Sequence, residues 1–561
     1  MIAYIVAFIC LCAQSGFAKN YCVDASNGND TNAGNTPEFC WKSIAKVNKS
    51  SFNPGDNIYF KRGEIWEETL IVSSSGAEGC PITFGAYGDG DNPRIKCTNT
   101  FSDWVLEVDQ SPLKVFKGTM PGIKNSWGAM KNGLRVPQYY GYKVKGSEWS
   151  APKNVAQIKN GFFFSKLNRG VFFFRHDAGN PKEMEIGARK YGIYIANKKY
   201  IIIDSIDVYG PGGRSDKGSS TGFAQIVIDS SDNVIIKNNT LSYHDSGGAF
   251  IKNGSTNCIY QNVTSYGHQS TGLYFYQAGE GNKAINCMVY KCGNLLTDHG
   301  DMGLIGVWKT PGVLIDGCYV HDNGHFNMSK IDAGISLVQS PDGHVNRCLI
   351  KNTGGTGLQF AENSDCGILS YCVINGWGLY GQTIIKKSHI EGIRIGGGYT
   401  TSTLINCKIY NNLLIHGGNT PGNWAAMRIA NRVNGGLQVK NNIFYNNKGV
   451  YEIYAESKDD FKNWVFSNNL FYRTHGIAIN WNNNEYDYKH ILGNNKGCYS
   501  YDQKQELNSI TADPKLLGNY MGIMSDSPCI DNGVNVNLST DYHGNSVPIG
   551  EGVDIGPFEY R

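Results

Sequence analysis

The sequence has little net charge, few prolines and no paired-cysteine metal motif. Its 51 basic and 48 acidic residues leave a formal charge of +3 with no basic stripe, so nucleic acid is not an expected partner. Beyond the N-terminus, no apolar run approaches the ~18 residues that a membrane-spanning helix needs. Paired Cys-x-x-Cys motifs, which bind zinc, are also absent. These absences argue against a nucleic-acid-binding tail, a membrane span and a zinc knuckle.

Glycine and tyrosine dominate what is present. The chain has 69 Gly and 33 Tyr against 17 Pro in 561 residues. Tyrosine favours strands and glycine favours tight turns, so this composition predicts an all-β protein built from many short strands.

The N-terminus has the pattern of a secretory signal peptide. An apolar stretch from Ile2 to Ala13 precedes a small-x-small cleavage pattern, Gly16-Phe17-Ala18. We therefore expect a protein secreted to the extracellular space or the periplasm, where disulfides can form. Three pairs of cysteines lie close enough in sequence to be candidate bridges, although sequence alone does not fix connectivity: Cys22 with Cys40, Cys80 with Cys97, and Cys498 with Cys529.

From about residue 200 the chain repeats itself. One short apolar strand in each repeat begins at a cysteine, and these cysteines lie 24 to 35 residues apart: Cys258, Cys287, Cys318, Cys348, Cys372 and Cys407. A second short strand begins at a glycine, namely Gly272, Gly303, Gly334, Gly357 and Gly392. Such strands are stable only when each coil stacks on the next.

The repeat predicts a right-handed parallel β-helix, a solenoid of about ten coils with strands ~4.8 Å apart. The cysteines would form an interior ladder of free thiols, because their neighbours are apolar. A β-propeller is the competing repeat fold, but its units are longer, roughly 40 residues or more.

Motifs at both ends of the chain resemble those of secreted right-handed β-helix proteins. At the N-terminus they are Tyr21, Val23, Asp24, Gly28-Asn29-Asp30, Trp41, Pro54-Gly55-Asp56, Trp66 and Pro81–Gly88; at the C-terminus they are Ser527–Asp531, Asp541, Gly544 and Asp554–Tyr560. The resemblance is to the pectin-lyase-like superfamily, which includes polysaccharide lyases and glycoside hydrolases. It implies the architecture more specifically than the reaction.

We expect five segments along the chain. They are a signal peptide (1–18), an N-terminal cap with the first coils (19–100), an insertion packed on the solenoid (101–195), the main β-helix coils (196–485) and a C-terminal segment (486–561). Within the insertion, the phenylalanine-rich stretch from Gly161 to Phe174 predicts a buried β-hairpin.

Aspartates and histidines gather at one corner of consecutive coils. Asp301 and Asp332 each lie two residues before a strand-opening glycine, so in register they would be ~5 Å apart. Such a pair can supply the acid and the nucleophile or base of glycoside hydrolysis. His299 and His325 lie nearby in sequence and would assist them.

The period-two alternation predicts a substrate groove beside these acids. Equivalent outward positions carry Tyr274, Ser336, Gln359, Arg394 and Arg428, and Trp308 lies on a neighbouring strand. Arginine binds carboxylate or sulfate, and aromatic faces suit sugar rings, so the expected substrate is an acidic polysaccharide. His244 and His268, from the same corner, complete the candidate substrate-binding set.

Two alternatives to hydrolysis remain open. The resemblance also implies a calcium-dependent polysaccharide lyase, in which Lys309 or Arg394 would be the base and Asp298, Asp301 and Asp332 would bind Ca²⁺. Neither the Trp-x-Asp-His signature of pectate lyases nor the Asn-Thr-Asp and Gly-His-Gly set of polygalacturonase-like hydrolases occurs. The second alternative is a non-catalytic glycan-binding adhesin. In each case we expect a monomer with no firmly required cofactor.

Overall fold

The computed structural model describes residues 18–121, 128–137, 154–166, 170–212, 223–293, 303–323, 333–378, 391–397, 404–417, 425–430, 433, 435–447, 451–456, 463–473 and 476–561. The chain divides into two compact units. Unit 1 comprises Met1–Gly213, Gln225–Leu241 and Asn257–Ile259, and unit 2 comprises Arg214–Ala224, Ser242–Thr256 and Tyr260–Arg561.

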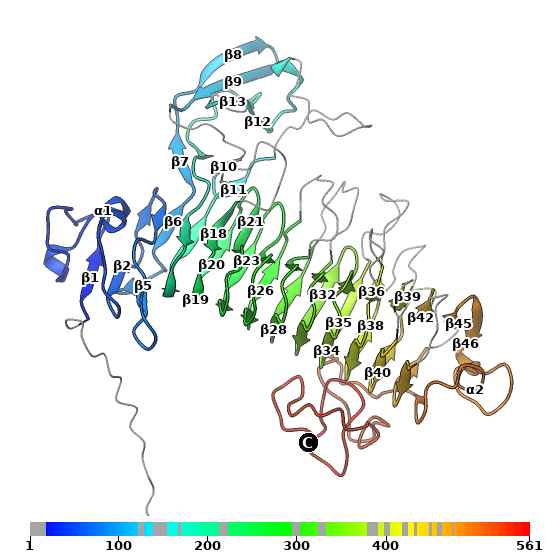
Figure 1. Cartoon of the computed structure of the whole chain (residues 1–561). Coiled ribbons are helices and arrows are strands. Elements are labelled where there is room, and N and C mark those ends of the chain that lie inside the picture. Colours follow the sequence, from blue (N-terminus) through cyan, green and yellow to red (C-terminus); the bar gives the residue numbers. More distant parts are fainter. Residues whose placement is uncertain are drawn as a thin grey trace, which may run out of the picture. The chain divides into compact units, whose positions relative to one another are not determined.

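The fold is a right-handed parallel β-helix, as the repeat predicts (Figure 1). Three sheets, here called A, B and C, have thirteen strands each. The chain passes from sheet A to B to C and back to A, so each coil contributes one strand to each sheet. Each sheet therefore has more strands than the solenoid of about ten coils that the repeat predicts. The difference arises because the N-terminal segment already contributes strands to all three sheets.

In unit 1, sheet A contains β1 (Asn20–Val23), β2 (Asn57–Lys61), β5 (Ile82–Tyr87), β16 (Lys199–Asp204) and β19 (Asp232–Lys237). Sheet B contains β3 (Ile65–Trp66), β6 (Arg94–Lys96), β17 (Asp207–Tyr209) and β20 (Thr240–Ser242), and sheet C contains β4 (Leu70–Ile71), β15 (Ile193–Ala196) and β18 (Ala224–Asp229).

In unit 2, sheet A contains β22 (Ile259–Gln261), β25 (Lys283–Ile285), β28 (Leu314–Asp316), β31 (His344–Asn346), β34 (Ile368–Ser370), β37 (Lys408–Tyr410), β40 (Gln438–Lys440) and β43 (Val465–Ser467). Sheet B contains β23 (Thr264–Tyr266), β26 (Met288–Tyr290), β29 (Tyr319–His321), β32 (Leu349–Thr353), β35 (Val373–Trp377), β38 (Leu413–Ile415), β41 (Ile443–Tyr445), β44 (Leu470–Tyr472) and β47 (Ile510–Thr511). Sheet C contains β21 (Gly247–Lys252), β24 (Leu273–Tyr276), β27 (Ile305–Trp308), β30 (Ile335–Val338), β33 (Leu358–Ala361), β36 (Glu391–Ile395), β39 (Ala425–Ile429), β42 (Tyr451–Ala455), β45 (Ile477–Trp481) and β46 (Asn484–Asp487).

The sequence repeat revealed two strands per coil, whereas the structure has three. The strands of sheets A and B are separated by only two residues, as at Gly317-Cys318 between β28 and β29. The first of the two residues adopts a left-handed conformation, with φ of 63° at Gly317 and 51° at Asn286. Asparagine and glycine tolerate this conformation best, and so short a turn hides the strand boundary in the sequence.

The interior thiol ladder is confirmed for four cysteines. Cys287, Cys318, Cys348 and Cys372 occupy the inward position of successive A-to-B turns and are buried and free. Burial raises the pKa of the Cys287 and Cys348 thiols, which makes them poor nucleophiles. Asparagines replace cysteine at this turn in later coils: Asn412, Asn442 and Asn469.

Cys258 and Cys407 do not belong to this ladder. Both precede sheet A strands, β22 and β37, and therefore lie at the C-to-A corner of the coil. The residues around all six cysteines have the same polar and apolar pattern. The sequence therefore does not distinguish the cysteines of the A-to-B corner from those of the C-to-A corner.

The insertion of unit 1 forms two four-stranded antiparallel sheets. One contains β7 (Thr98–Phe101), β10 (Ala129–Lys131), β11 (Leu134–Arg135) and β14 (Met184–Gly187); the other contains β8 (Val105–Gln110), β9 (Leu113–Thr119), β12 (Phe163–Lys166) and β13 (Val171–Arg175). The predicted hairpin is confirmed, since Phe163 pairs with Phe174 across antiparallel strands and both are buried.

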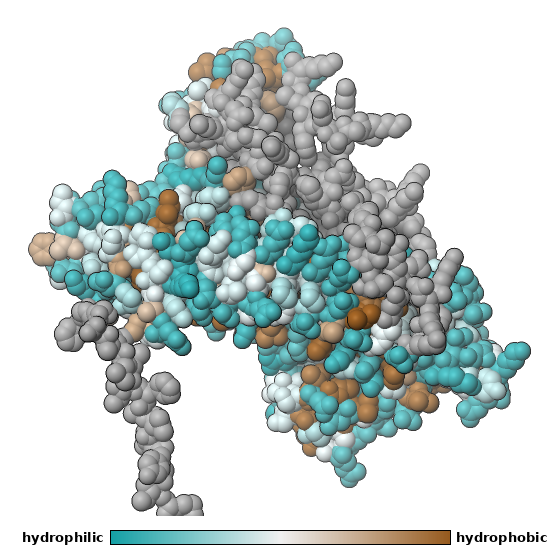
Figure 2. All heavy atoms as spheres, viewed as in Figure 1, coloured by the Kyte–Doolittle hydropathy of each residue, from teal (hydrophilic) through white to brown (hydrophobic). Residues whose placement is uncertain are grey.

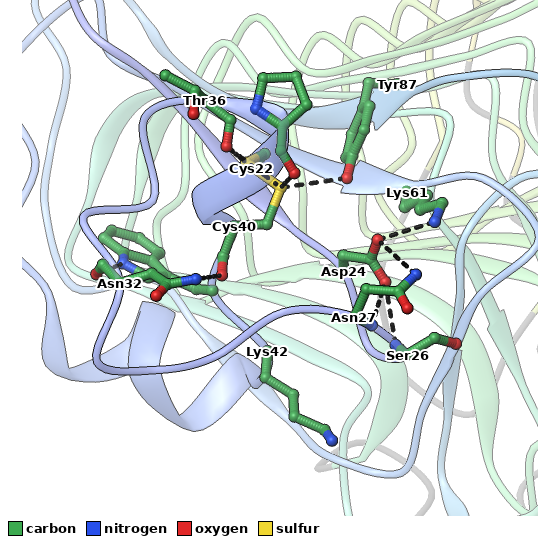
Figure 3. The surroundings of a disulfide bond; sticks show 12 residues. Cys22, Asp24, Ser26, Asn27, Asn32, Thr36, Cys40, Lys42, Lys61 and Tyr87 are labelled. Carbon is green, nitrogen blue, oxygen red and sulfur yellow. Dashed lines mark hydrogen bonds and ion pairs between the residues drawn. A yellow bond between two sulfur atoms is a disulfide. The ribbon is translucent and has the colours of Figure 1, made fainter.

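Several N-terminal motif residues have structural roles in unit 1 (Figure 3). Cys22 and Cys40 form the predicted disulfide. The Asp24 carboxylate accepts hydrogen bonds from the backbone N–H groups of Ser26 and Asn27 and pairs with Lys61 Nζ at 2.8 Å. The N-terminal motif residue Asp24 therefore has a structural role, since it stabilises a turn and pairs with Lys61.

The two other predicted bridges are wrong. Cys97 forms no disulfide, and Cys498 and Cys529 are free thiols in the structure, so neither Cys80–Cys97 nor Cys498–Cys529 forms. Cys529 is buried against the apolar outer face of sheet B.

In unit 2, the C-terminal segment covers the outer face of sheet B. Leu516, Ile523, Ile555 and Phe558 pack there in one hydrophobic cluster with strand residues such as Ile443. Figure 2 shows hydrophobic residues also on the surface of this segment, where Leu517 and Met524 are exposed. Within the described ranges the helices are few and short: α1 (Ile44–Lys49), α2 (Tyr499–Gln503) and the 3-10 turns Pro37–Phe39, Val155–Gln157 and Tyr488–His490. Among the residues described, no helix is long and apolar enough to cross a membrane.

Candidate functional site

A continuous row of mostly polar side chains runs along the outer face of sheet C in unit 2. Strand pairing places Tyr274, Gly306, Ser336, Gln359, Arg394, Arg428, Tyr454 and Asn480 opposite one another on successive strands from β24 to β45. We call these eight residues the polar row. The alignment of Tyr274, Ser336, Gln359, Arg394 and Arg428 that the sequence predicts is thus confirmed.

The expected exposure of this row is wrong. Tyr274, Ser336, Gln359, Arg394 and Arg428 each retain only 1–8% of their surface. Polar groups at such depth need partners, because an unsatisfied buried group costs about 1–3 kcal/mol and a charged one costs more. The partners that the described residues supply therefore indicate which groups are structural.

Arg428 is held between two glutamates. Its Nη1 donates to Glu391 Oε1 at 2.8 Å, and its Nη2 donates to both carboxylate oxygens of Glu456 at 2.8 and 2.9 Å. Thr356 Oγ1 donates to the second oxygen of Glu391, which is fully buried. Although burial opposes the charge, the two carboxylates raise the pKa of Arg428 above its ordinary value.

The neutral members of the row are also packed closely. Gln359 Nε2 donates to Ser336 Oγ at 2.7 Å. The Tyr274 ring lies over Gly306, where an added Cβ would come within 2.8 Å of the ring. The glycine therefore makes room for the tyrosine, and burial raises the pKa of the Tyr274 hydroxyl.

Beside the polar row, a second row on sheet C carries aromatic side chains. Tyr276 and Trp308 lie opposite each other on β24 and β27, with stacked rings whose centroids are 4.8 Å apart. Lys309 Nζ lies 4.5 Å from the centroid of the Trp308 ring. Both rings are half-buried and Lys309 is exposed, so this row retains accessible aromatic surface next to the polar row.

His244 and His268 have no exposed surface. His268 Nδ1 accepts the backbone N–H of His244, and its Nε2 lies 3.1 Å from Ser265 Oγ. His244 Nδ1 accepts the N–H of Ser246. Their imidazoles stabilise the turn before β21, and this placement does not support their prediction as substrate-binding residues.

The acids at the centre of the sequence hypothesis lie outside the described residues, as do their predicted neighbours: Asp298, His299, Asp301, His325 and Asp332. The strands that follow Asp301 and Asp332 pair Ile305 with Ile335, so Gly303 lies opposite Ala333. The register expected from the sequence, with Gly303 opposite Gly334, is therefore wrong by one residue. Across the described ranges, no group of three or more histidines, cysteines or acids is placed to hold a metal ion.

Sequence reasoning missed Glu391 and Glu456, the partners of Arg428. Glu391 opens β36 and Glu456 directly follows β42. Glu391 lies two residues before the inward-facing Ile393, so strand alternation would have placed it at the B-to-C corner. No acid recurs at the same position in other coils, so the sequence pattern did not mark Glu391 as a candidate.

Comparisons with known proteins agree with this fold. Residues 224–391 match the family described as "Right handed beta helix region". The solved structure entitled "The complex structure of XylC with xylose" aligns over 97% of this chain and 98% of that chain, with a TM-score of 0.63 and 13% identity. A second structure, pectate lyase Pel9A, covers 97% of this chain and 96% of that chain, with a TM-score of 0.43 and 12% identity.

The chain has the right-handed parallel β-helix fold. Among curated proteins it is 37% identical over 75 residues to a lacto-N-biosidase of Bifidobacterium longum subsp. longum. That match spans 13% of this chain and only 5% of the length of the relative.

Proposed function

We propose that this protein is a secreted enzyme that degrades a polysaccharide, which it binds along the outer face of sheet C. One observation carries the proposal: eight successive strands of one sheet align the polar row, and an aromatic pair lies beside it. A linear polymer of sugars presents hydroxyl groups and apolar ring faces repeatedly along its length, and such a row matches that repetition.

The similar proteins support a carbohydrate substrate. One is a lacto-N-biosidase, and another was solved with xylose. Experiment must identify the sugar and the linkage. The polar row favours an acidic glycan because it contains Arg394, whose guanidinium has no carboxylate partner among the described residues.

We propose hydrolysis as the reaction. Asp301 and Asp332 would act as general acid and as nucleophile or base, with His299 and His325 setting their protonation. Both acids precede sheet C strands that carry the polar row, β27 and β30. We therefore infer that a glycan bound along the polar row would have one of its glycosidic bonds near Asp301 and Asp332.

The test combines three readouts on purified protein and a panel of acidic and neutral polysaccharides. New reducing ends without ultraviolet absorbance of unsaturated uronates support hydrolysis. Growth of that absorbance, stopped by a chelator, supports the calcium-dependent lyase with Lys309 or Arg394 as base and contradicts hydrolysis. Binding without cleavage supports the adhesin and contradicts an enzyme.

Asp301→Asn and Asp332→Asn test the assignment of the acids. We expect each to lower turnover by at least ~100-fold, the usual scale of a lost acid or base, with little change in melting temperature. Asp526→Asn is the matched control, because Asp526 is an exposed aspartate of the C-terminal segment. Full activity in both site variants would remove these acids from the mechanism.

A further inference from the structure

The two arginines of the polar row differ in one respect. Arg394 and Arg428 lie opposite each other on β36 and β39, and each is 8% exposed. Arg428 makes three hydrogen bonds to two carboxylates. Neither Nη group of Arg394 makes a hydrogen bond or ion pair with any described residue, and its Nε is buried without a partner.

An unpaired buried guanidinium is costly. Removing a charge from water without a partner costs several kcal/mol, and proteins normally pair such charges. Arg428 shows that this chain can pair such a charge, since Glu391 and Glu456 neutralise it. The lack of an equivalent carboxylate at Arg394 therefore indicates that its counter-charge comes from outside the described residues.

The immediate surroundings of Arg394 leave its charge uncompensated. On one side Gln359 is neutral and directs its Nε2 to Ser336. On the other side Arg428 already has its own carboxylates. Gly397 lies beside the guanidinium, where an added Cβ would be 2.5 Å from Arg394 Nη2, so this neighbour contributes no side chain and no charge.

We propose that Arg394 binds an anionic substituent of the glycan, a carboxylate or a sulfate, and that Arg428 is a structural residue. A planar guanidinium donates two parallel N–H bonds to either group. The inference rests on the proposed function, because it places the ligand along the same polar row. It refines that function by naming the feature of the sugar that one residue recognises.

Binding to matched pairs of polymers tests the site. The probes are polygalacturonate against its methyl ester, and dextran sulfate against dextran, each measured by affinity electrophoresis at fixed ionic strength. We expect the wild type to prefer at least one acidic form, and Arg394→Gln to lose about 10- to 100-fold of that affinity, the scale of hydrogen bonds to a charged group. Arg394→Lys should restore part of it. The pair that responds distinguishes carboxylate from sulfate.

Lys408→Gln is the matched control, since it removes one positive charge from β37, the sheet A strand that follows β36 along the chain. It should leave the preference unchanged. Melting temperature without ligand gives a second readout: Arg394→Gln should hold or raise it, whereas a structural arginine would lower it. No preference in the wild type, an unchanged preference in Arg394→Gln, or a strongly lowered melting temperature in that variant would each overturn the inference.

The outcomes separate this inference from the proposed function. Arg394-dependent binding of an acidic polymer without any cleavage would retain the anion site and remove the enzyme. Cleavage of neutral polysaccharides alone, unaffected by Arg394→Gln, would retain the enzyme and remove the anion site.

Discussion

The outer faces of sheets B and C in unit 2 are built by the same coils and carry opposite chemistry. On sheet B, Leu349, Val373, Leu413, Ile443 and Leu470 lie opposite one another on successive strands. The C-terminal segment packs against this apolar row. On sheet C, the corresponding outward row is polar from Ser336 onward.

The comparison shows how one backbone pattern gives two kinds of surface. Period-two alternation exposes every second residue of each strand to the outside of the coil. Where those residues are aliphatic, the chain covers them itself; where they are polar, the described residues satisfy all but a few groups. Sheet B therefore contributes to stability, and the proposed ligand binding rests on sheet C.

The largest expected effect comes from removing the cover of sheet B. Phe558→Ala should lower the free energy of unfolding by about 3–5 kcal/mol, because Phe558 is buried in the cluster and its loss leaves a cavity. Urea denaturation measures the change. Leu517→Ala, in the same segment but 41% exposed, should change stability by less than ~0.5 kcal/mol. Equal effects would show that the cluster is not the source of stability.

On sheet C, loss of Arg428 should be almost as damaging. Arg428→Met leaves Glu391 buried beside an apolar side chain and should cost about 3 kcal/mol. The double variant Arg428→Met/Glu391→Gln should recover part of that loss, since it removes the unpaired charge. A single variant as stable as the wild type would contradict the structural assignment of Arg428.

A buried acid on β42 should make stability depend on pH. Burial raises the pKa of Glu452 from 4.5 to about 7, so the folded state holds its proton more tightly than the unfolded state. The resulting stabilisation is complete below about pH 4.5 and is lost as pH rises through about 7, at roughly 1 kcal/mol per pH unit. Between about pH 4.5 and pH 7, the melting temperature of Glu452→Gln should therefore depend less on pH than that of the wild type. The exposed Glu485→Gln should leave the wild-type slope, and an identical slope in Glu452→Gln would contradict the raised pKa.

The smallest effect concerns an amide that fastens the C-terminal segment to the coils. Asn441 Nδ2 donates to the carbonyl of Val534, and its Oδ1 accepts the Val534 N–H. Asn441 has φ of 58°, a conformation that glycine adopts freely. Asn441→Gly therefore removes these two hydrogen bonds, and a third from Asn441 Nδ2 to Asn411 Oδ1, without backbone strain and should cost about 1–2 kcal/mol in urea denaturation. No measurable loss would mean that the other contacts of the segment hold it without this amide.

Much of the fold was predictable because it repeats. Period-two alternation and the recurring cysteines were enough to predict a β-helix and its thiol ladder. The two-residue turn between sheets A and B concealed a third strand, and the similarity of two corners misplaced Cys258 and Cys407. Register between distant coils depends on loop length, and a one-residue shift at β27 displaced the expected pairing of Gly303.

The site was predictable only in part, for a physical reason. The row containing Gln359, Arg394 and Arg428 follows from strand alternation. The partners of Arg428 do not, because Glu391 and Glu456 reach it from positions that no repeat marks. Burial of His244 and His268 also depends on turn packing rather than on sequence pattern.

The most direct measurement is a crystal structure of the protein with an oligosaccharide from whichever polysaccharide it cleaves or binds. The account predicts sugar rings along sheet C, with hydroxyl groups near Gln359 and an acidic substituent at the Arg394 guanidinium. Sugar bound on sheet A or on the C-terminal segment, with the polar row unoccupied, would contradict it.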